Sequence, residues 1–144
     1  MKSVKIKVSR GINNTIRKGF FSMPDKVFVY GTLMKGHGNH GYYLSQSEFL
    51  GKGEVTGYAL YAVSSFPGIV PEGGEKVKGE VYIVDRDTLK RLDSLESEGS
   101  LYLRKQVEVL IDGQIVQAWT YIWNHETKGK DKITYDAQPW KGRL

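Results

Sequence analysis

Short runs of β-branched and aromatic residues, separated by glycines and polar turns, dominate the hydrophobic pattern of this 144-residue chain. Residues 26–30 form such a run and end at Gly31, which is typical of a buried strand that leaves a sheet for a loop. Further strands are predicted over about 48–63 and 76–84. Between them, residues 64–74 contain closely spaced prolines and glycines, which predict an irregular connection with fixed turns.

A β-hairpin is the clearest local feature of the second half. Two alternating runs, 102–111 and 115–123, flank Asp112-Gly113. Asp-Gly readily adopts the positive φ angles of a two-residue turn whose twist matches that of paired strands. The chain after Asn124 is polar and is predicted to be irregular.

Two helices are predicted to accompany the strands. Residues 31–41 form a glycine-rich loop, and the tyrosines and leucine that follow at 42–44 suggest a short helix with Asn39 as its cap. A longer helix is predicted over 88–96, with Asp87 as its N-cap. Many strands with one or two short helices predict an α+β fold with a small, mixed, barrel-like sheet.

Glu96 is the first candidate for chemistry, because it shares the apolar face of the longer helix. Leu89, Leu92 and Glu96 stand at i, i+3 and i+7, so the carboxylate points toward the core with the two leucines. Lost hydration there is expected to raise its pKa toward neutrality, where a carboxyl group transfers protons well. An alternative stays open, because Asp93 has a similar bearing and Glu96 could pair with Arg104 in a structural salt bridge.

Several other chemistries are excluded by the composition. The chain has no cysteine, and therefore no disulfide, thiolate nucleophile or cysteine-ligated metal. His37, His40 and His125 follow no familiar zinc spacing, and no serine lies in a GxSxG motif. The glycine-rich loop matches neither GxGxxG nor GxxxxGK[ST], so a phosphate site is not expected. No metal and no cofactor are predicted, and no apolar run reaches the roughly 18 residues of a membrane helix.

The net charge of +5 comes from the start of the chain. Six of the 21 lysines and arginines lie in residues 1–22, which hold no acid, so 15 basic and 16 acidic residues remain. The body therefore has no general basic bias, and nucleic acid is not an expected partner; phosphate binding would belong to residues 1–22 alone. We predict a basic N-terminal extension over 1–22 and one domain over 23–144, with Met23 as an alternative start.

Motifs in separate parts of the chain resemble one family. Residues 27–33 place Tyr-Gly-Thr-Leu after a hydrophobic strand, residues 66–68 read Phe-Pro-Gly, and residues 92–96 read Leu-Asp-Ser-Leu-Glu, followed by Tyr-Leu-Arg at 102–104. In this order and spacing they resemble the gamma-glutamyl cyclotransferase-like family, which includes gamma-glutamylamine cyclotransferases and the plant AIG2-like proteins. The resemblance covers residues 25–124.

This resemblance implies a small mixed barrel whose first-strand loop forms a pocket for a gamma-glutamyl group, with Glu96 projecting into it. The implied reaction is attack of the substrate's own α-amine on its γ-carbonyl, which releases 5-oxoproline and a free amine without a cofactor. Glu96 would act first as general base and then as general acid. The residues implied in substrate binding are Tyr30, Gly31, Thr32, Leu33 and Tyr102.

Some points stay open at this stage. Tyr30 and Tyr102 are strand-end aromatics, for which packing is an equally good explanation. The leaving group, an amine or an amino acid, is not identified. Some relatives have no established activity, so the alternative function is a non-catalytic binding module for a small acidic or gamma-glutamyl ligand. We expect a cytoplasmic protein that acts on a small molecule.

Overall fold

Strands far outnumber helices in the fold, which the computed structural model describes for residues 24–142. The elements in chain order are β1 (Asp25–Val29), α1 (His40–Tyr43), β2 (Glu48–Ala62), β3 (Pro67–Val84), α2 (Arg86–Leu95), β4 (Tyr102–Ile111), β5 (Gln114–Trp123), β6 (Asp131–Ile133) and a 3₁₀ turn, η1 (Tyr135–Ala137).

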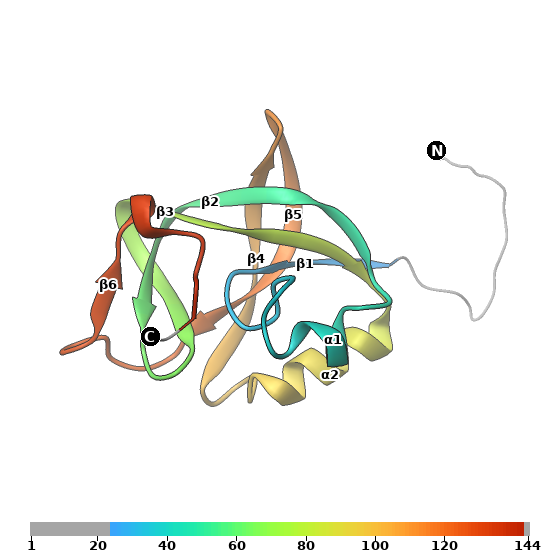
Figure 1. Ribbon diagram of the computed structural model, residues 1–144, viewed down its shortest axis with the longest axis horizontal. Helices are drawn as coiled ribbons and strands as arrows, with labels where there is room; N and C mark the ends of the chain where they lie inside the picture. Colours follow the sequence, from blue (N-terminus) through green and yellow to red (C-terminus); the bar gives the residue numbers. More distant parts are fainter. Residues whose placement is uncertain (1–23, 143–144) are drawn as a thin grey trace, which may run out of the picture.

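Strands β1 to β5 close into a ring (Figure 1). β1 pairs antiparallel with β3 and parallel with β5, β3 pairs with β2, β2 with β4, and β4 with β5. β6 pairs with β2 alone and extends the sheet. The two α-helices lie together below the ring in the view of Figure 1. The predicted class, a small mixed β-barrel with two short helices, is confirmed.

The barrel interior holds the hydrophobic core, because alternate residues of each strand point inward. Thr120 on β5 is fully buried there, and its hydroxyl donates to the carbonyl of Phe28 on β1 at 3.0 Å. Leu89 and Leu92 bring α2 onto the same core. The completely buried hydrophobic residues of the strands are Val27, Phe28, Leu60, Ile69, Val77, Val81 and Val109.

The predicted hairpin is confirmed as β4 and β5. Asp112 and Gly113 have φ angles of 48° and 80°, and the strands pair from Ile111 with Gln114 down to Tyr102 with Trp123. The turn lies at the top of Figure 1, beyond the other strands. A two-residue turn fixes this register, so every cross-strand pair of the hairpin follows from its position.

The predicted irregular connection over 64–74 is wrong. β3 already begins at Pro67, and its first part pairs with β2 from Ala62 opposite Pro67 to Tyr58 opposite Pro71. Proline and glycine are depleted in strands as a local preference, but a long partner strand overrides that preference. The true turn between β2 and β3 is therefore confined to a few residues after Ala62.

The cap of α2 is also corrected. Asp85, and not Asp87, is the N-cap: its carboxylate accepts a hydrogen bond from the backbone N–H of Thr88 at 2.7 Å, and the helix begins at Arg86. At α1, Asn39 occupies the N-cap position as predicted, but its side chain makes no capping bond and donates to Thr32 Oγ1 instead.

The tail after Asn124 is more ordered than predicted. It contains β6 and η1, and the buried side chain of Gln138 fixes it to β3. Gln138 Oε1 accepts from the backbone N–H of Lys78 at 2.8 Å, and Gln138 Nε2 donates to the carbonyl of Lys76 at 3.2 Å. A polar sequence thus follows a defined path, because its polar groups meet the backbone of β3.

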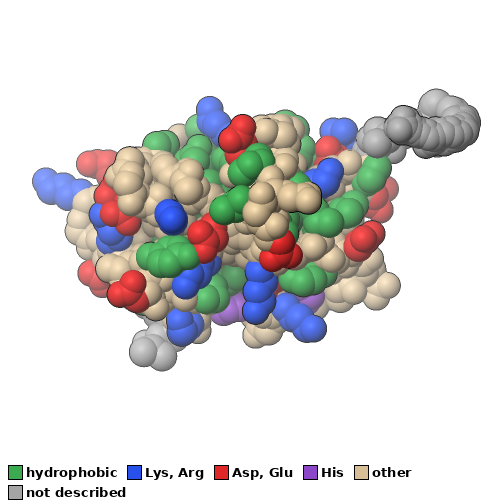
Figure 2. Space-filling model, turned by 90° about the horizontal axis from the view of Figure 1, so that it is seen from above, with side chains coloured by type: hydrophobic (Ala, Val, Ile, Leu, Met, Phe, Trp, Pro, Cys, Tyr) green, Lys and Arg blue, Asp and Glu red, His purple; other side chains and the backbone are tan. Residues whose placement is uncertain are grey.

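Charges of both signs are interspersed on the face shown in Figure 2. This agrees with the near-neutral body expected from the sequence. The predicted basic extension over 1–22 lies outside the described residues. Within residues 24–142, the structure contains no helix both long enough and apolar enough to cross a membrane.

The corrected cap gives a testable prediction. Asp85→Ala should lower the free energy of unfolding by about 1 kcal/mol, because the N–H of Thr88 loses its acceptor. Asp87→Ala is the matched control in the same helical turn. It should lower the free energy of unfolding by only about 0.3 kcal/mol, because it removes one favourable charge near the positive end of the helix dipole. Urea unfolding of both variants measures this, and an equal cost for the two would contradict the assignment of Asp85.

Candidate active site

A single pocket brings together every site residue that the sequence analysis named. It encloses about 340 Å³ of empty space, its open mouth included, and lies where the loop after β1 meets the end of α2 and the strands β4 and β5. Its lining consists of Phe28, Val29, Tyr30, Gly31, Thr32, Leu33, Phe66, Pro67, Glu96, Tyr102 and Tyr121. The roles given to Glu96 and to the five predicted binding residues remain predictions.

The loop after β1 owes its shape to a contact that the sequence analysis did not foresee. A Cβ on Gly31 would lie 2.6 Å from Pro67 Cγ, so the Tyr-Gly-Thr-Leu and Phe-Pro-Gly motifs touch at this glycine. The sequence analysis named Gly31 as a substrate-binding residue, and that role remains a prediction. The structure adds a packing requirement at Gly31, the approach of Pro67, which closes one side of the pocket.

Hydrogen bonds within the loop hold it in place. The backbone N–H of Met34 donates to Gly31 O at 3.1 Å, and that of Asn39 donates to Thr32 O at 3.0 Å. Asn39 Nδ2 also donates to Thr32 Oγ1 at 2.9 Å, and His40 Nδ1 lies 3.0 Å from Leu33 O. Thr32 Oγ1 accepts its bond from Asn39, so the hydroxyl proton of Thr32 stays free for a ligand.

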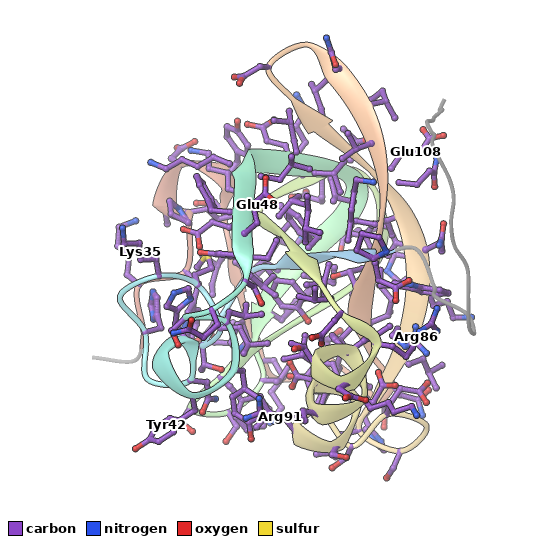
Figure 3. All side chains as sticks on the ribbon, turned by 90° about the vertical axis from the view of Figure 1, so that its right-hand side faces the viewer. Lys35, Tyr42, Glu48, Arg86, Arg91 and Glu108 are labelled. Carbon is purple, nitrogen blue, oxygen red and sulfur yellow. The ribbon has the colours of Figure 1, made fainter. Side chains whose placement is uncertain are left out.

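The two helices that flank the pocket are joined to each other. Figure 3 shows Arg91 of α2 beside Tyr42 of α1, and Arg91 Nη2 donates to the carbonyl of Tyr42 at 2.9 Å. The same guanidinium lies 4.9 Å from the ring centre of Tyr43. Thus α1, which follows the pocket loop, is held against the helix that carries Glu96.

Glu96 is placed at the C-cap of α2, one residue beyond the last helical position. Its backbone N–H donates to Leu92 O at 2.9 Å, which fixes where its side chain leaves the helix. The side chain is half-buried in the pocket, and burial raises its pKa to about 7. The inward bearing expected from Leu89 and Leu92 is confirmed, since both leucines are fully buried.

The alternative in which Arg104 neutralises Glu96 is wrong. Arg104 Nε lies 3.0 Å from Asp93 Oδ1, and its guanidinium lies 4.3 Å from the ring centre of Trp119. Within residues 24–142, the Glu96 side chain has neither an ion pair nor a hydrogen bond to another residue. Its carboxyl group therefore titrates in the range where it can both take and return a proton.

Tyrosine hydroxyls surround this carboxyl group, and each donates elsewhere. Tyr30 donates to the carbonyl of Tyr121, Tyr102 to the carbonyl of Pro67 and Tyr121 to Asp93 Oδ1, all at 2.7 Å. Burial raises the pKa of all three, and the nearby charge of Glu96 raises it further, so they stay neutral at physiological pH. Their free lone pairs can only accept hydrogen bonds from a ligand.

Tyr121 is the polar pocket residue that the sequence analysis missed. The hairpin register places it directly opposite Arg104. Because the Asp112-Gly113 turn sets that register, counting back from the turn would have found Tyr121 beside the Tyr-x-Arg motif. What the turn could not indicate is that Asp93, on a helix, meets this pair.

Metal ligands do not gather in the described part of the chain, where no group of three or more histidine, aspartate or glutamate side chains could hold an ion. His40 contacts the pocket loop through Leu33, whereas His125 is exposed and contacts the carbonyl of Ser100. The pocket thus offers one titrating carboxyl group, tyrosine oxygens and the backbone of residues 31–33. Such an arrangement suits proton transfer on a small polar substrate.

Comparison with known proteins places this geometry in a family. The sequence model of the family described as gamma-glutamyl cyclotransferase, AIG2-like, matches residues 27–142. The chain belongs to this family. The motifs in the sequence supported a resemblance over residues 25–124, and the family match extends beyond them to residue 142, which includes the ordered tail. The chain is therefore a gamma-glutamyl cyclotransferase-like enzyme.

Individual relatives agree with this membership. A Vibrio cholerae serotype O1 protein with a provisional gamma-glutamylcyclotransferase name is 45% identical over 123 residues, which cover 85% of this chain and 100% of that protein. The gamma-L-glutamyl-butirosin B gamma-glutamyl cyclotransferase of Niallia circulans is 33% identical over 135 residues, covering 87% of this chain and 85% of that one. An AIG2-like protein from Mus musculus shares the fold, with a TM-score of 0.68 and 29% identity over 74% of this chain and 82% of that one.

The contact of Gly31 with Pro67 can be tested. Gly31→Ala should lower the free energy of unfolding by about 1–3 kcal/mol, because the added methyl group must displace the Pro67 ring and the loop around it. Gly38→Ala in the same loop is the control, since nothing lies within 4 Å of its Cβ position. Thermal unfolding of both measures the difference, and a Gly31→Ala variant as stable as the control would refute the contact.

Proposed function

We propose that this enzyme converts a gamma-glutamyl amine or gamma-glutamyl amino acid into 5-oxoproline and the free amine. The observation that carries the proposal is Glu96, a half-buried carboxyl group with a pKa of about 7 inside a pocket lined by neutral hydrogen-bonding groups. Family membership supports the reaction class. The pocket geometry supports Glu96 as the group that moves the proton.

The reaction needs one group that first accepts and then donates a proton. In the proposed sequence, Glu96 takes a proton from the α-ammonium group, and the freed amine attacks the γ-carbonyl carbon to close a five-membered ring. The γ-carbon to nitrogen bond then breaks as Glu96 returns the proton to the leaving nitrogen. The ring nitrogen loses its second proton to the released amine, which departs as an ammonium ion and leaves 5-oxoproline with one N–H. A pKa near 7 suits both steps, because neither protonation state is strongly favoured at physiological pH.

Substrate positioning is assigned to the groups around Glu96. The tyrosine oxygens of the pocket accept hydrogen bonds, so they suit the N–H groups of the α-ammonium. The backbone N–H groups of residues 31–33 and the Thr32 hydroxyl are donors suited to carbonyl and carboxylate oxygens. Holding the folded conformer in which amine and carbonyl meet would supply much of the rate enhancement.

The leaving group is proposed to be an amine of varied structure. The pocket is partly open to solvent, and two of its lining residues, Phe66 and Tyr102, pack with Trp123 in an aromatic cluster. The relative from Niallia circulans is named as a cyclotransferase of gamma-L-glutamyl-butirosin B. Both facts favour a site that grips the gamma-glutamyl end and leaves the amine end outside.

The first test compares the wild type with Glu96→Gln for 5-oxoproline release from a panel of gamma-glutamyl amines and dipeptides. Glu96→Gln should lower kcat by at least about 100-fold, since the proton acceptor is lost while the shape is kept. The variant should be at least as stable as the wild type at pH 8, where burial of the charged carboxylate disfavours folding. Glu98→Gln is the control beside it. Full activity in Glu96→Gln would refute the mechanism, and silence of the wild type across the panel would favour the binding-module alternative.

The pKa of Glu96 also predicts a pH dependence. As the base of the first step, Glu96 must be deprotonated in the free enzyme, so kcat/KM should rise tenfold per pH unit below about pH 7 and level off above it. Initial rates from pH 5 to 8.5 measure this limb. A profile that stays nearly flat over this range, as expected for a glutamate with the ordinary pKa of 4.5, would contradict the desolvated site.

A further inference from the structure

The proton positions around Glu96 separate its tyrosine neighbours into two kinds. Tyr30 and Tyr102 donate to backbone carbonyls, which belong to the barrel itself. Tyr121 donates to a side chain, Asp93 Oδ1, at 2.7 Å. The direction of the Tyr121 hydroxyl proton therefore depends on the side chain of Asp93, whereas the other two hydroxyl protons are directed by backbone carbonyl groups.

Asp93 is itself fixed by contacts on the side away from the pocket. The same Oδ1 lies 3.0 Å from Arg104 Nε, and the Arg104 guanidinium lies over the ring of Trp119. Asp93 precedes Glu96 by three residues on α2, so the two carboxyl groups lie on neighbouring parts of one helix end. Tyr121 is linked to both carboxyl groups: it donates a hydrogen bond to Asp93, and it lines the same pocket as Glu96.

We propose that Asp93 is a positioning residue that keeps the Tyr121 proton away from the Glu96 carboxylate. With that proton held by Asp93, the Tyr121 oxygen can only accept hydrogen bonds on its pocket side. Glu96 then has no donor among its tyrosine neighbours and stays a competent base. This positioning role matters for catalysis only if Glu96 is the base of the proposed reaction, so it rests on the proposed function.

Removing Asp93 should reverse this arrangement. The Tyr121 hydroxyl would lose its acceptor and could turn toward Glu96, and a hydrogen bond to the charged carboxylate lowers the pKa of the acid. Glu96 would then be a weaker base, and the rise of kcat/KM would shift to lower pH with a lower plateau. The ionisable groups around Glu96 and Tyr121 are Tyr30 at the end of β1, Tyr102 and Arg104 on β4, and Asp93 on α2.

A titration that needs no substrate tests the inference. In protein labelled with ¹³C-glutamate, the carboxyl signal of Glu96 is identified by its loss in Glu96→Gln and followed by NMR from pH 3 to 9. Wild type should titrate near pH 7. Asp93→Ala should titrate about one pH unit lower, the size of one hydrogen bond to a charged group. An unchanged value in a folded Asp93→Ala protein would overturn the proposal.

Asp93→Ala also frees Arg104, which could lower the pKa of Glu96 by its charge. The double variant Asp93→Ala/Tyr121→Phe separates these effects, because it keeps the free arginine and lacks the hydroxyl. Its Glu96 should titrate where it does in Tyr121→Phe alone. A shift as large as that of Asp93→Ala would assign the effect to Arg104 and overturn the role of Tyr121.

Tyr121→Phe keeps the proposal testable if Asp93→Ala does not fold. It removes one hydroxyl whose proton, in the proposal, never reaches Glu96, so the pKa of Glu96 should change little. A rise of about one unit would mean that Tyr121 had been donating to Glu96, and would overturn the proposal.

The chain offers a matched control outside the pocket. Tyr61 donates to Glu72 Oε1 at 2.9 Å, and Glu72 pairs with Lys132, so a second tyrosine, carboxylate and cation are linked outside the pocket. Glu72→Ala should leave both the titration of Glu96 and the pH profile unchanged.

The two proposals fail in different ways. If the wild type releases no 5-oxoproline but the NMR shifts follow the expected pattern, the proposed function fails and the Asp93 arrangement stands. If turnover depends on Glu96 but its titration ignores Asp93, the proposed function stands and the positioning role fails.

Discussion

The position of β1 between β3 and β5 is the constraint on which the site depends. β1 is short, but it closes the ring by pairing antiparallel on one side and parallel on the other. Its last residues must therefore leave the sheet at the end of the barrel where β4 begins and where α2 ends. A shift in the register of β1 is disfavoured, because Val27, Phe28 and Val29 are all buried and each would have to be repacked. The loop after β1 thus meets Glu96 as a consequence of closing the barrel.

At the meeting point, close packing determines the shape and hydrogen bonding determines the electrostatics. Gly31 and Pro67 pack without room for another carbon, which sets one wall of the pocket. The three buried tyrosine hydroxyls satisfy their donors on protein oxygens, as buried polar groups must. Glu96 receives none of these protons and keeps a raised pKa. A carboxyl group in such surroundings disfavours folding when it is charged, which is a common property of catalytic acids and bases.

Much of the fold could be read from local patterns. The hairpin followed from Asp112-Gly113, because the positive φ angles of that turn are a property of the dipeptide. The first strand followed from its run of β-branched and aromatic residues, and the longer helix with its buried leucines followed from helical periodicity. Apart from the N-cap of α2, the predictions that failed concern residues whose partners lie on other elements. The early start of β3 depends on pairing with β2, and the ordered tail depends on the contacts of Gln138 with β3.

The sequence by itself determined which residues are equipped for chemistry. The bearing of Glu96 on its helix and the motif around Gly31 are local facts, and they were sufficient to indicate one carboxyl group and one loop. Only the tertiary structure decided that Arg104 pairs with Asp93 and leaves Glu96 without a charge partner, and that Tyr121 completes the pocket. The physical reason is that a salt bridge or a desolvated carboxyl group depends on distances set by several elements together. Helical spacing gave Asp93 and Glu96 similar bearings, and the packing of α2 on β4 and β5 distinguished them.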